Sequence, residues 1–203
     1  MQRVDLATGC ISEAAVGPAF TAPHDVVLAG DSVWVGNYGE ATVERRDADT
    51  LGLTAAVSAR AAGGLAFDGT RVWLLCCGVT TMEMLSSTPL PNVSDVAATA
   101  DGGAWVSFRG IGRIARYDRG GDLVTEVADL PRGDPQYYTP IAVTADHVAV
   151  AAPLNRVTIV SAISGEVIET HHVPGLISIG SAGDSFWVLS DTEADTAHLQ
   201  RIG

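Results

Sequence analysis

An all-β fold is predicted by three features of the sequence. The tryptophans recur in one phrase, in which turn-forming residues precede an apolar strand that contains Trp34, Trp73, Trp105 or Trp187. A fifth copy has Ala149 at the tryptophan position, so the copies follow one another about every 40 residues, a spacing typical of propeller blades. Between the copies lie short alternating strands and turns rich in Gly and Asp. Together these features predict a five-bladed β-propeller of four-stranded antiparallel blades.

The first blade shows how the strands are assigned. Residues 26–28 are expected to form its inner strand and residues 33–35 its second strand. Residues 41–46 then form the third strand and residues 53–57 the outermost one, because turn residues separate these short runs. The same order predicts a single domain over residues 1–203, with blades at about 24–57, 62–90, 93–129, 139–171 and 175–203, the last together with 2–16.

The two ends of the chain predict how the ring closes. Gln2-Arg3-Val4 resembles Gln200-Arg201-Ile202 at an offset of 198 residues, which is five repeats of about 40. The last blade lacks a fourth strand, and residues 11–16 form a fourth strand without a blade. The N-terminal strand is therefore expected to pair with the C-terminal blade and to remove an exposed sheet edge. Residues 2–6 and 198–202 compete for the third strand of that blade.

Composition excludes several classes of partner. The chain has 12 Lys and Arg against 24 Asp and Glu, a formal charge of −12 that repels nucleic acid and anionic membrane surfaces. No apolar run is long enough to cross a membrane and no signal peptide precedes the repeat, so a cytoplasmic protein is expected. Cys10, Cys76 and Cys77 are an odd number, and two are adjacent, which favours reduced thiols. Cys76 and Cys77 either pack between blades or supply a nucleophile beside His24.

Two segments carry a resemblance to a known family. Residues 34–43, Trp-Val-Gly-Asn-Tyr-Gly-Glu-Ala-Thr-Val, and residues 3–9, Arg-Val-Asp-Leu-Ala-Thr-Gly, resemble the actinobacterial YVTN and virginiamycin-B-lyase-like propellers, which usually have six or seven blades. The resemblance implies a lyase-like activity in which a histidine and a glutamate assist a magnesium-dependent elimination. It places the histidine at His24, in Pro23-His24-Asp25, and the nearest candidate for the glutamate is Glu193. Magnesium is implied by the resemblance alone.

Most of the unusual side chains are expected on one face of the propeller. Propeller topology brings the loops that lead into the inner strands and the loops between second and third strands to this face, here called the loop face. The catalytic candidates are His24, His172 and Glu193; the ligand-binding candidates are Asp25, Tyr38, Asp95, Arg109, Tyr137 and Tyr138. The tyrosines suit a planar ligand, and the arginine suits a carboxylate or hydroxyl group.

Several of these candidates also have a structural interpretation. His24 either transfers protons or bonds a neighbouring blade. Asp25 and Asp95 begin inner strands, which permits a glycosidase-like carboxylate pair. Together with Asp191 they could instead bind a hard cation, or all three could simply cap turns. No metal-ligand set is predicted, because the two adjacent histidines before residue 173 point apart.

The function predicted from the sequence is the binding of a small molecule in the central funnel, with lyase-like or other acid–base catalysis. The alternative is a non-catalytic protein-interaction or sensor propeller, free-standing or part of a larger protein. Small-molecule binding requires the side chains on the loop face to converge on one pocket, whereas the non-catalytic alternative does not.

Overall fold

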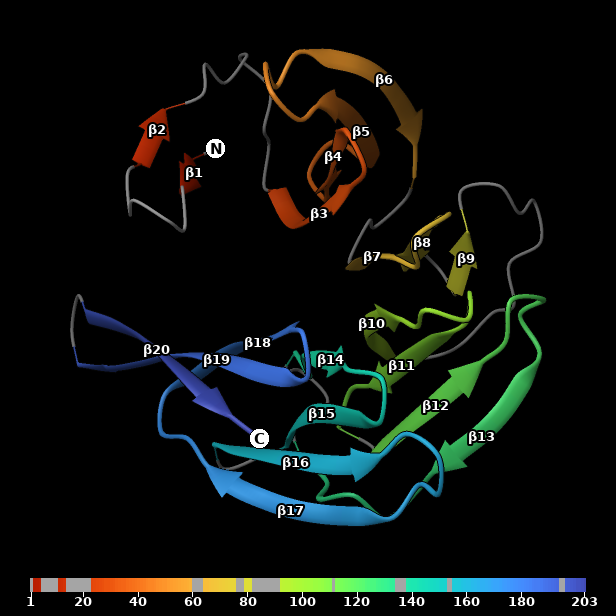
Figure 1. Ribbon diagram of the computed structural model, residues 1–203, viewed down its shortest axis with the longest axis vertical. Helices are drawn as coiled ribbons and strands as arrows, with labels where there is room; N and C mark the ends of the chain where they lie inside the picture. Colours follow the sequence, from red (N-terminus) through yellow and green to blue (C-terminus); the bar gives the residue numbers. More distant parts are fainter. Residues whose placement is uncertain are drawn as a thin grey trace.

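The computed structural model of the chain describes residues 2–4, 11–13, 23–59, 64–75, 79–81, 92–110, 112–133, 138–152, 155–193 and 196–203. All regular structure in these ranges is β-strand, and every strand pair is antiparallel (Figure 1). Among the same residues, no helix has the length and apolar character needed to span a membrane. The predicted all-β class is confirmed.

Five successive sheets follow the repeat, and the strands of each sheet pair in chain order. The first sheet has β3 (Pro23–Ala29), β4 (Ser32–Asn37), β5 (Thr42–Asp47) and β6 (Leu53–Ser58); the second has β7 (Gly64–Phe67), β8 (Val72–Leu75) and β9 (Val79–Thr81). The third has β10 (Val93–Ala98), β11 (Ala104–Phe108), β12 (Arg113–Tyr117) and β13 (Leu123–Val127); the fourth has β14 (Ile141–Val143), β15 (His147–Ala152), β16 (Arg156–Ser161) and β17 (Val167–His172); the fifth has β18 (Leu176–Ala182), β19 (Ser185–Glu193) and β20 (Thr196–Ile202). The first strands of neighbouring sheets contact one another, so they surround the centre of the molecule (Figure 1).

The blade count and the ring closure differ from the prediction. Within the described residues, three of these sheets have four strands and two have three, so five complete four-stranded blades are not what the structure shows. The expected pairing of the N-terminal segment with the C-terminal blade is wrong for the part of it that is described. β2 (Ile11–Glu13) pairs with β1 (Gln2–Val4) in a separate two-stranded sheet. Pairing with a strand close in sequence costs much less loop-closure entropy than pairing with β20.

Each tryptophan lies on the second strand of its sheet, as the repeat predicts. Where it is buried, it packs against the next sheet along the chain. Trp105 on β11 is fully buried in one cluster with Ile141, Val148 and Val160 of β14–β16. Trp73 on β8 packs in the same manner against β10–β12. The contact between one tryptophan and the following sheet is therefore the repeating unit of the core.

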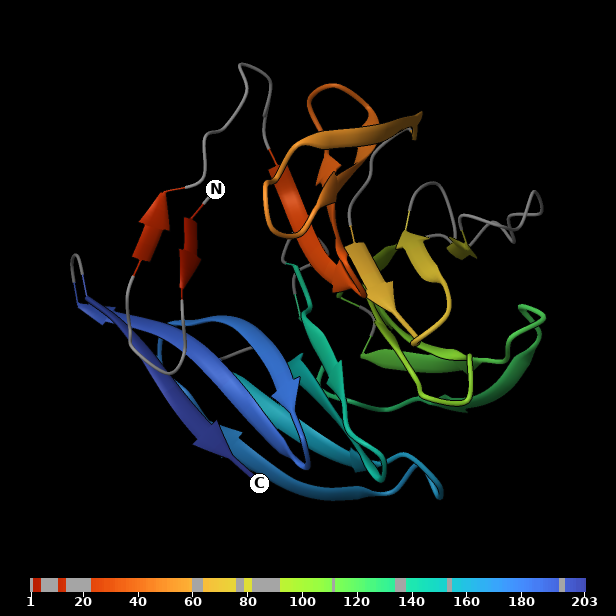
Figure 2. The same cartoon turned by 45° about the horizontal axis from the view of Figure 1, so that its top comes forward.

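This packing stops at the opening between β18–β20 and β3–β6, where β1 and β2 lie (Figures 1 and 2). Trp187 on β19 is 36% exposed, whereas Trp73 and Trp105 are at most 1% exposed. Across the opening, Val26 on β3 is 54% exposed. The residues at the same position on the first strands of the other four sheets are buried: Leu65, Val96, Ile141 and Ile179. Trp34 is half-buried. Trp187 therefore does not pack between two sheets as Trp73 and Trp105 do.

Candidate functional site

The segment that enters β14 is fixed at the loop face by two buried serines. The hydroxyl of Ser94 accepts a hydrogen bond from the backbone N–H of Thr139 at 2.6 Å. The hydroxyl of Ser107 donates to the carbonyl oxygen of the same residue at 2.5 Å. Both serines are almost fully buried, and Thr139 directly follows Tyr138. These bonds hold Tyr138 close to the start of β10.

Asp25 and Asp95 occupy equivalent places at bulges near the start of β3 and β10. Each carboxylate accepts the backbone N–H of the residue that follows it, at 2.7 Å for Asp25 and 2.8 Å for Asp95. The other carboxylate oxygen accepts an N–H from the inner strand of the next sheet. For Asp25 this donor is Leu65 at 2.6 Å, and for Asp95 it is Ile141 at 3.0 Å. The two carboxylates therefore join consecutive inner strands.

This bonding does not fit the magnesium ion that the family resemblance implies. Magnesium is coordinated by carboxylate oxygens, but each of the four oxygens of Asp25 and Asp95 has one lone pair engaged by a backbone N–H group, which fixes its orientation and weakens it as a metal ligand. In the described part of the chain, no group of three His, Cys, Asp or Glu side chains could hold a metal ion. The mechanism considered below therefore contains no step through magnesium.

Around these carboxylates lies a group of titratable side chains, here called the axial cluster: His24, Asp25, Asp95 and Tyr138. The ring of His24 meets that of Tyr138 edge to face, with centroids 5.8 Å apart, and lies 6.3 Å from the ring of Tyr38. Tyr138 and Asp95 share a side-chain hydrogen bond. The structure thus brings four predicted site residues together, with Tyr38 beside them.

Burial and like charge perturb this cluster. Burial raises the pKa of Asp95 to about 7, against its ordinary 3.8; the N–H of Ile141 opposes the change and the nearby charge of Asp25 adds to it. Burial also raises the pKa of Asp25, although the backbone bonds to Leu65 and Val26 oppose that rise. The pKa of Tyr138 is raised by burial and by Asp95, and Arg109 opposes that rise. Arg109 is therefore close enough for its charge to act on Tyr138.

The raised pKa of Asp95 predicts a pH dependence of stability. Between its unfolded value near 3.8 and its folded value of about 7, the native state binds more protons than the unfolded state, so stability falls as the pH rises. From pH 5 to pH 7 we expect the free energy of unfolding to fall by about 2 kcal/mol through this group. Urea denaturation at both pH values measures the change. In Asp95→Asn the fall should be clearly smaller; an equal fall in the variant would contradict the assignment to Asp95.

The remaining predicted residues lie elsewhere or are not described. His172 is the last residue of β17, the outermost strand of its sheet, where it is exposed and opposite Arg156. The expectation that it lies in a loop leading to an inner strand is therefore wrong, because the pairing of β17 with β16 continues through Thr170 and His171 to this residue. Glu193 ends β19, but its side chain lies outside the described set, as do Tyr137 and the three cysteines.

A pocket of about 760 Å³ opens on the loop face between the sheets β10–β13 and β14–β17. It is lined by Phe108, Gly110, Gly112, Arg113, Leu130, Pro131, Arg132, Gly133, Tyr138, Thr139, Pro140, Val150, Ala151, Asn155, Leu176 and Ile177. Tyr138 belongs both to this pocket and to the axial cluster. The pocket therefore adjoins the cluster, and the sheets β10–β13, β14–β17 and β18–β20 all contribute to its wall.

Two loops that form the pocket wall are bonded to each other. The N–H of Leu130 donates to the carbonyl of Gly112 at 3.0 Å, and the N–H of Gly133 donates to that of Gly110 at 3.3 Å. Gly112 has a φ of +61°, and a Cβ atom there would lie 2.1 Å from the carbonyl oxygen of Leu130. Only glycine permits this approach, so the local sequence determines the shape of the wall.

The sequence interpretation did not single out three polar residues of this region. Asn37, at the end of β4, is fully buried, and neither polar atom of its side chain has a hydrogen-bond partner in the described structure. Arg113 and Arg132 line the pocket. Asn37 precedes Tyr38 in residues 34–43, the segment that carries the family resemblance. Its position there could have identified it as a site residue. The two arginines stand in ordinary strand and turn contexts, and no sequence signal distinguished them.

No protein-family model and no curated protein matches the sequence. Several solved structures are similar to it. Hydrazine synthase of Kuenenia stuttgartiensis has a TM-score of 0.68 at 17% identity, over 92% of this chain and 60% of that one. Virginiamycin B lyase from Staphylococcus aureus has a TM-score of 0.66 at 15% identity, over 99% and 76%. The Pan2 WD40 domain of Neurospora crassa has a TM-score of 0.66 at 13% identity, over 89% and 60%.

These similarities support the propeller part of the resemblance seen in the sequence, and none of them supports the YVTN family in particular. The chain spans only 60% of the hydrazine synthase chain. At identities below a fifth, the likeness concerns the fold alone. The protein is a β-propeller of antiparallel sheets, similar in fold to virginiamycin B lyase and to WD40 domains.

Proposed function

We propose that this propeller binds a small molecule on the loop face, in the pocket beside Tyr138. The observation that carries the proposal is the pocket itself. Its volume of about 760 Å³ is within the range of small-molecule sites, and apolar walls with a few converging polar groups are typical of them. The proposal includes a ring of five repeats around the axis, because five sheets follow one another along the chain.

The axial cluster favours acid–base catalysis as a second function of the same face. His24 is exposed and lies against Tyr138, which bonds Asp95, a carboxyl group whose pKa is raised to about 7. A carboxyl group with this pKa exchanges protons near neutral pH, which is the requirement for a general acid or base. A lyase is among the proteins of similar fold. In this mechanism His24 moves the proton, Tyr138 contacts the bound molecule, and Asp95 holds Tyr138 in place through their side-chain hydrogen bond.

The binding site is tested with a variant that fills the pocket. Ile177 lines the pocket and is 47% exposed, so Ile177→Trp narrows the site without disturbing the core. Ile163→Trp is the matched control, because Ile163 is 83% exposed in the turn between β16 and β17. In a thermal-shift screen of small metabolites, compounds that stabilise the wild type should also stabilise the control but not Ile177→Trp. Equal shifts in all three proteins would place binding outside the pocket.

Catalysis is tested on the compounds that bind. Each is incubated with the protein, and its conversion is followed by liquid chromatography. If the site is catalytic, His24→Ala and His24→Gln should keep the thermal shift and lose the conversion. Full activity in both variants would exclude His24 as the proton-transfer group. Binding without conversion of any compound would favour the non-catalytic alternative, a recognition or sensor propeller.

A further inference from the structure

The pocket has a local charge opposite to that of the whole molecule. Of its lining residues in the described part of the chain, the charged ones are Arg113 and Arg132. The chain as a whole carries 24 acidic and 12 basic residues, with a formal charge of −12. A ligand that enters this pocket therefore meets cations, although the surrounding molecule is anionic.

Arg113 is held in a fixed orientation at the pocket wall. Its guanidinium carbon lies 3.9 Å from the centre of the Phe108 ring, a cation–π contact. Its Nη1 also lies 3.1 Å from a carboxylate oxygen of Glu126, and Glu126 does not line the pocket. Arg113 thus keeps its positive charge, but the carboxylate of Glu126 partly offsets the field that this charge exerts on the pocket.

Arg132 carries the charge that is not compensated. It is exposed in the loop after β13, and no described residue forms an ion pair or a hydrogen bond with its side chain. The loop is held on both sides, by the bond from Gly133 to Gly110 and by the rigid ring of Pro131. The loop backbone is therefore fixed, and the guanidinium group at the end of the Arg132 side chain can bond a carboxylate through two parallel N–H groups.

The rest of the wall is mainly apolar. Its apolar residues are Phe108, Leu130, Pro131, Pro140, Val150, Ala151, Leu176 and Ile177, and those at least partly exposed are Pro131, Leu176 and Ile177. Burial of apolar ligand surface against them is favourable in proportion to the area removed from water. The wall therefore suits a molecule with a carbon body, and the two arginines suit an anionic group on it.

We propose that the pocket binds an apolar small molecule that carries a carboxylate group, with the carboxylate on Arg132 and Arg113 and the body against Leu176 and Ile177. This proposal rests on the proposed function, small-molecule binding in the same pocket. It adds the chemical class of the ligand: an anion is selected over a neutral molecule of the same shape, and a cation is rejected.

The experiment uses three probes of one shape and different charge: 2-naphthylacetate, 2-(2-naphthyl)ethanol and 2-(2-naphthyl)ethylamine. Their binding to the whole chain is measured by isothermal titration calorimetry at pH 7.5. We expect the carboxylate to bind roughly tenfold more tightly than the alcohol, since hydrogen bonds to charged groups contribute this much. Arg132→Gln should remove most of that preference and leave the affinity for the alcohol unchanged. Arg119→Gln, in an exposed turn outside the pocket, should change neither.

The outcomes separate this proposal from the proposed function. If Ile177→Trp prevents binding of the probes, but the wild type binds the carboxylate no more tightly than the alcohol, the proposed ligand class is wrong. The pocket is then still supported as the binding site. If the preference survives in Arg132→Gln, the anchor is wrong and the proposal is overturned. If no probe binds to the wild type, or if Ile177→Trp binds all three normally, both proposals fail. Tightest binding of the amine would also overturn the ligand class.

Discussion

Trp105→Ala is expected to lower the free energy of unfolding by about 3–5 kcal/mol, the range measured for deletion of large buried side chains. Trp105 is fully buried on β11 and packs against Ile141, Val148 and Val160 of the next sheet. Its loss leaves a cavity between the two sheets. The strand pairing within each sheet limits how far the sheets can move together to fill it. Equilibrium denaturation in urea measures the change.

Trp187→Ala is the matched control for this prediction, because Trp187 occupies the same place in the repeat. It is 36% exposed at the opening, with no following sheet against it, so its removal should cost less than about 1 kcal/mol. Trp105→Phe should cost less than Trp105→Ala. It refills most of the space, and the indole N–H that it removes has no hydrogen-bond partner in the described structure. Equal losses for Trp105→Ala and Trp187→Ala would contradict the packing of tryptophan on the next sheet.

The period of the repeat was sufficient to predict the strands. Alternation and turn residues placed β3–β6 within a few residues of their bounds, and the tryptophan position identified every second strand. Both signals are local, since they depend on side-chain periodicity and turn chemistry. Ring closure is not local. The similarity between residues 2–4 and 200–202 indicates an equivalent position in the repeat. Strand pairing also depends on loop length, however, and β1 pairs with β2, which is closer in sequence.

The candidate site was predicted in part, for a related reason. His24, Asp25, Asp95 and Tyr138 were found because propeller topology brings the starts of the inner strands together. The role of the two aspartates in joining inner strands was not predicted, because it depends on backbone N–H groups in the next sheet. The pocket was missed as well. Its wall combines the β11–β12 and β13–β14 loops, and their contact at Gly112 has no counterpart in local sequence patterns.

A charged residue on β5 is a sequence signal that the first sheet differs from the others on its side toward the opening. Arg46 lies opposite Val33, directly before the tryptophan position. The equivalent residues in the third, fourth and fifth sheets are Tyr117, Val160 and Ile202, all buried. In those sheets the position packs against the preceding sheet. In the first sheet a cation replaces the apolar side chain, and it requires an anion of its own.

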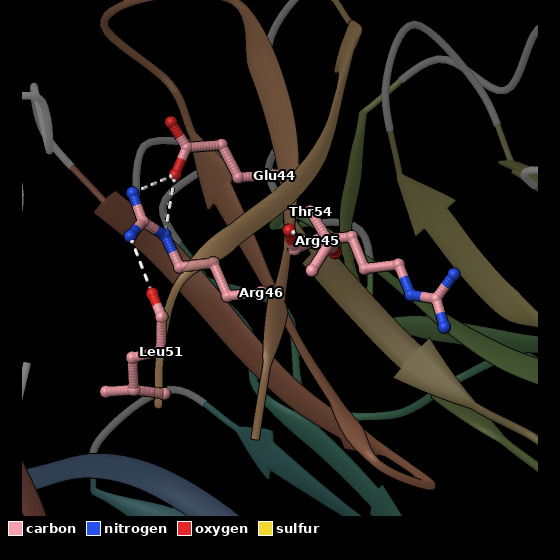
Figure 3. Close-up of polar contacts among 5 residues, drawn as sticks. All are labelled: Glu44, Arg45, Arg46, Leu51 and Thr54. Atoms are coloured by element: carbon pink, nitrogen blue, oxygen red, sulfur yellow. Dashed lines mark hydrogen bonds and ion pairs between the residues drawn. The ribbon is translucent and has the colours of Figure 1, made fainter. Parts of the chain in front are cut away.

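That anion is Glu44, two residues earlier on the same face of β5 (Figure 3). Arg46 donates to one carboxylate oxygen of Glu44 through Nε at 2.9 Å and through Nη2 at 2.7 Å. Its Nη1 donates to the carbonyl of Leu51 at 3.0 Å. Both side chains are only 8% exposed. Without Arg46, the buried carboxylate of Glu44 would lose the cation that these bonds supply.

Arg46→Ala is therefore expected to lower the free energy of unfolding by about 3–5 kcal/mol, the cost of leaving one partner of a buried pair. Arg45→Ala is the control on the same strand. Arg45 is exposed, points away from Glu44 and bonds Ser32 at 2.8 Å, so its loss should cost less than about 1 kcal/mol (Figure 3).

A double variant separates buried charge from lost packing. Glu44→Ala combined with Arg46→Tyr reproduces the residues that the third sheet has at the same places, Ala115 and Tyr117. It removes both charges, and we expect it to be less destabilised than Arg46→Ala alone, because no unpaired carboxylate remains. Urea denaturation of the four proteins gives the comparison. A double variant as unstable as Arg46→Ala would mean that packing, and not the buried carboxylate, accounts for the loss. Similar losses for Arg46→Ala and Arg45→Ala would mean that water reaches the pair.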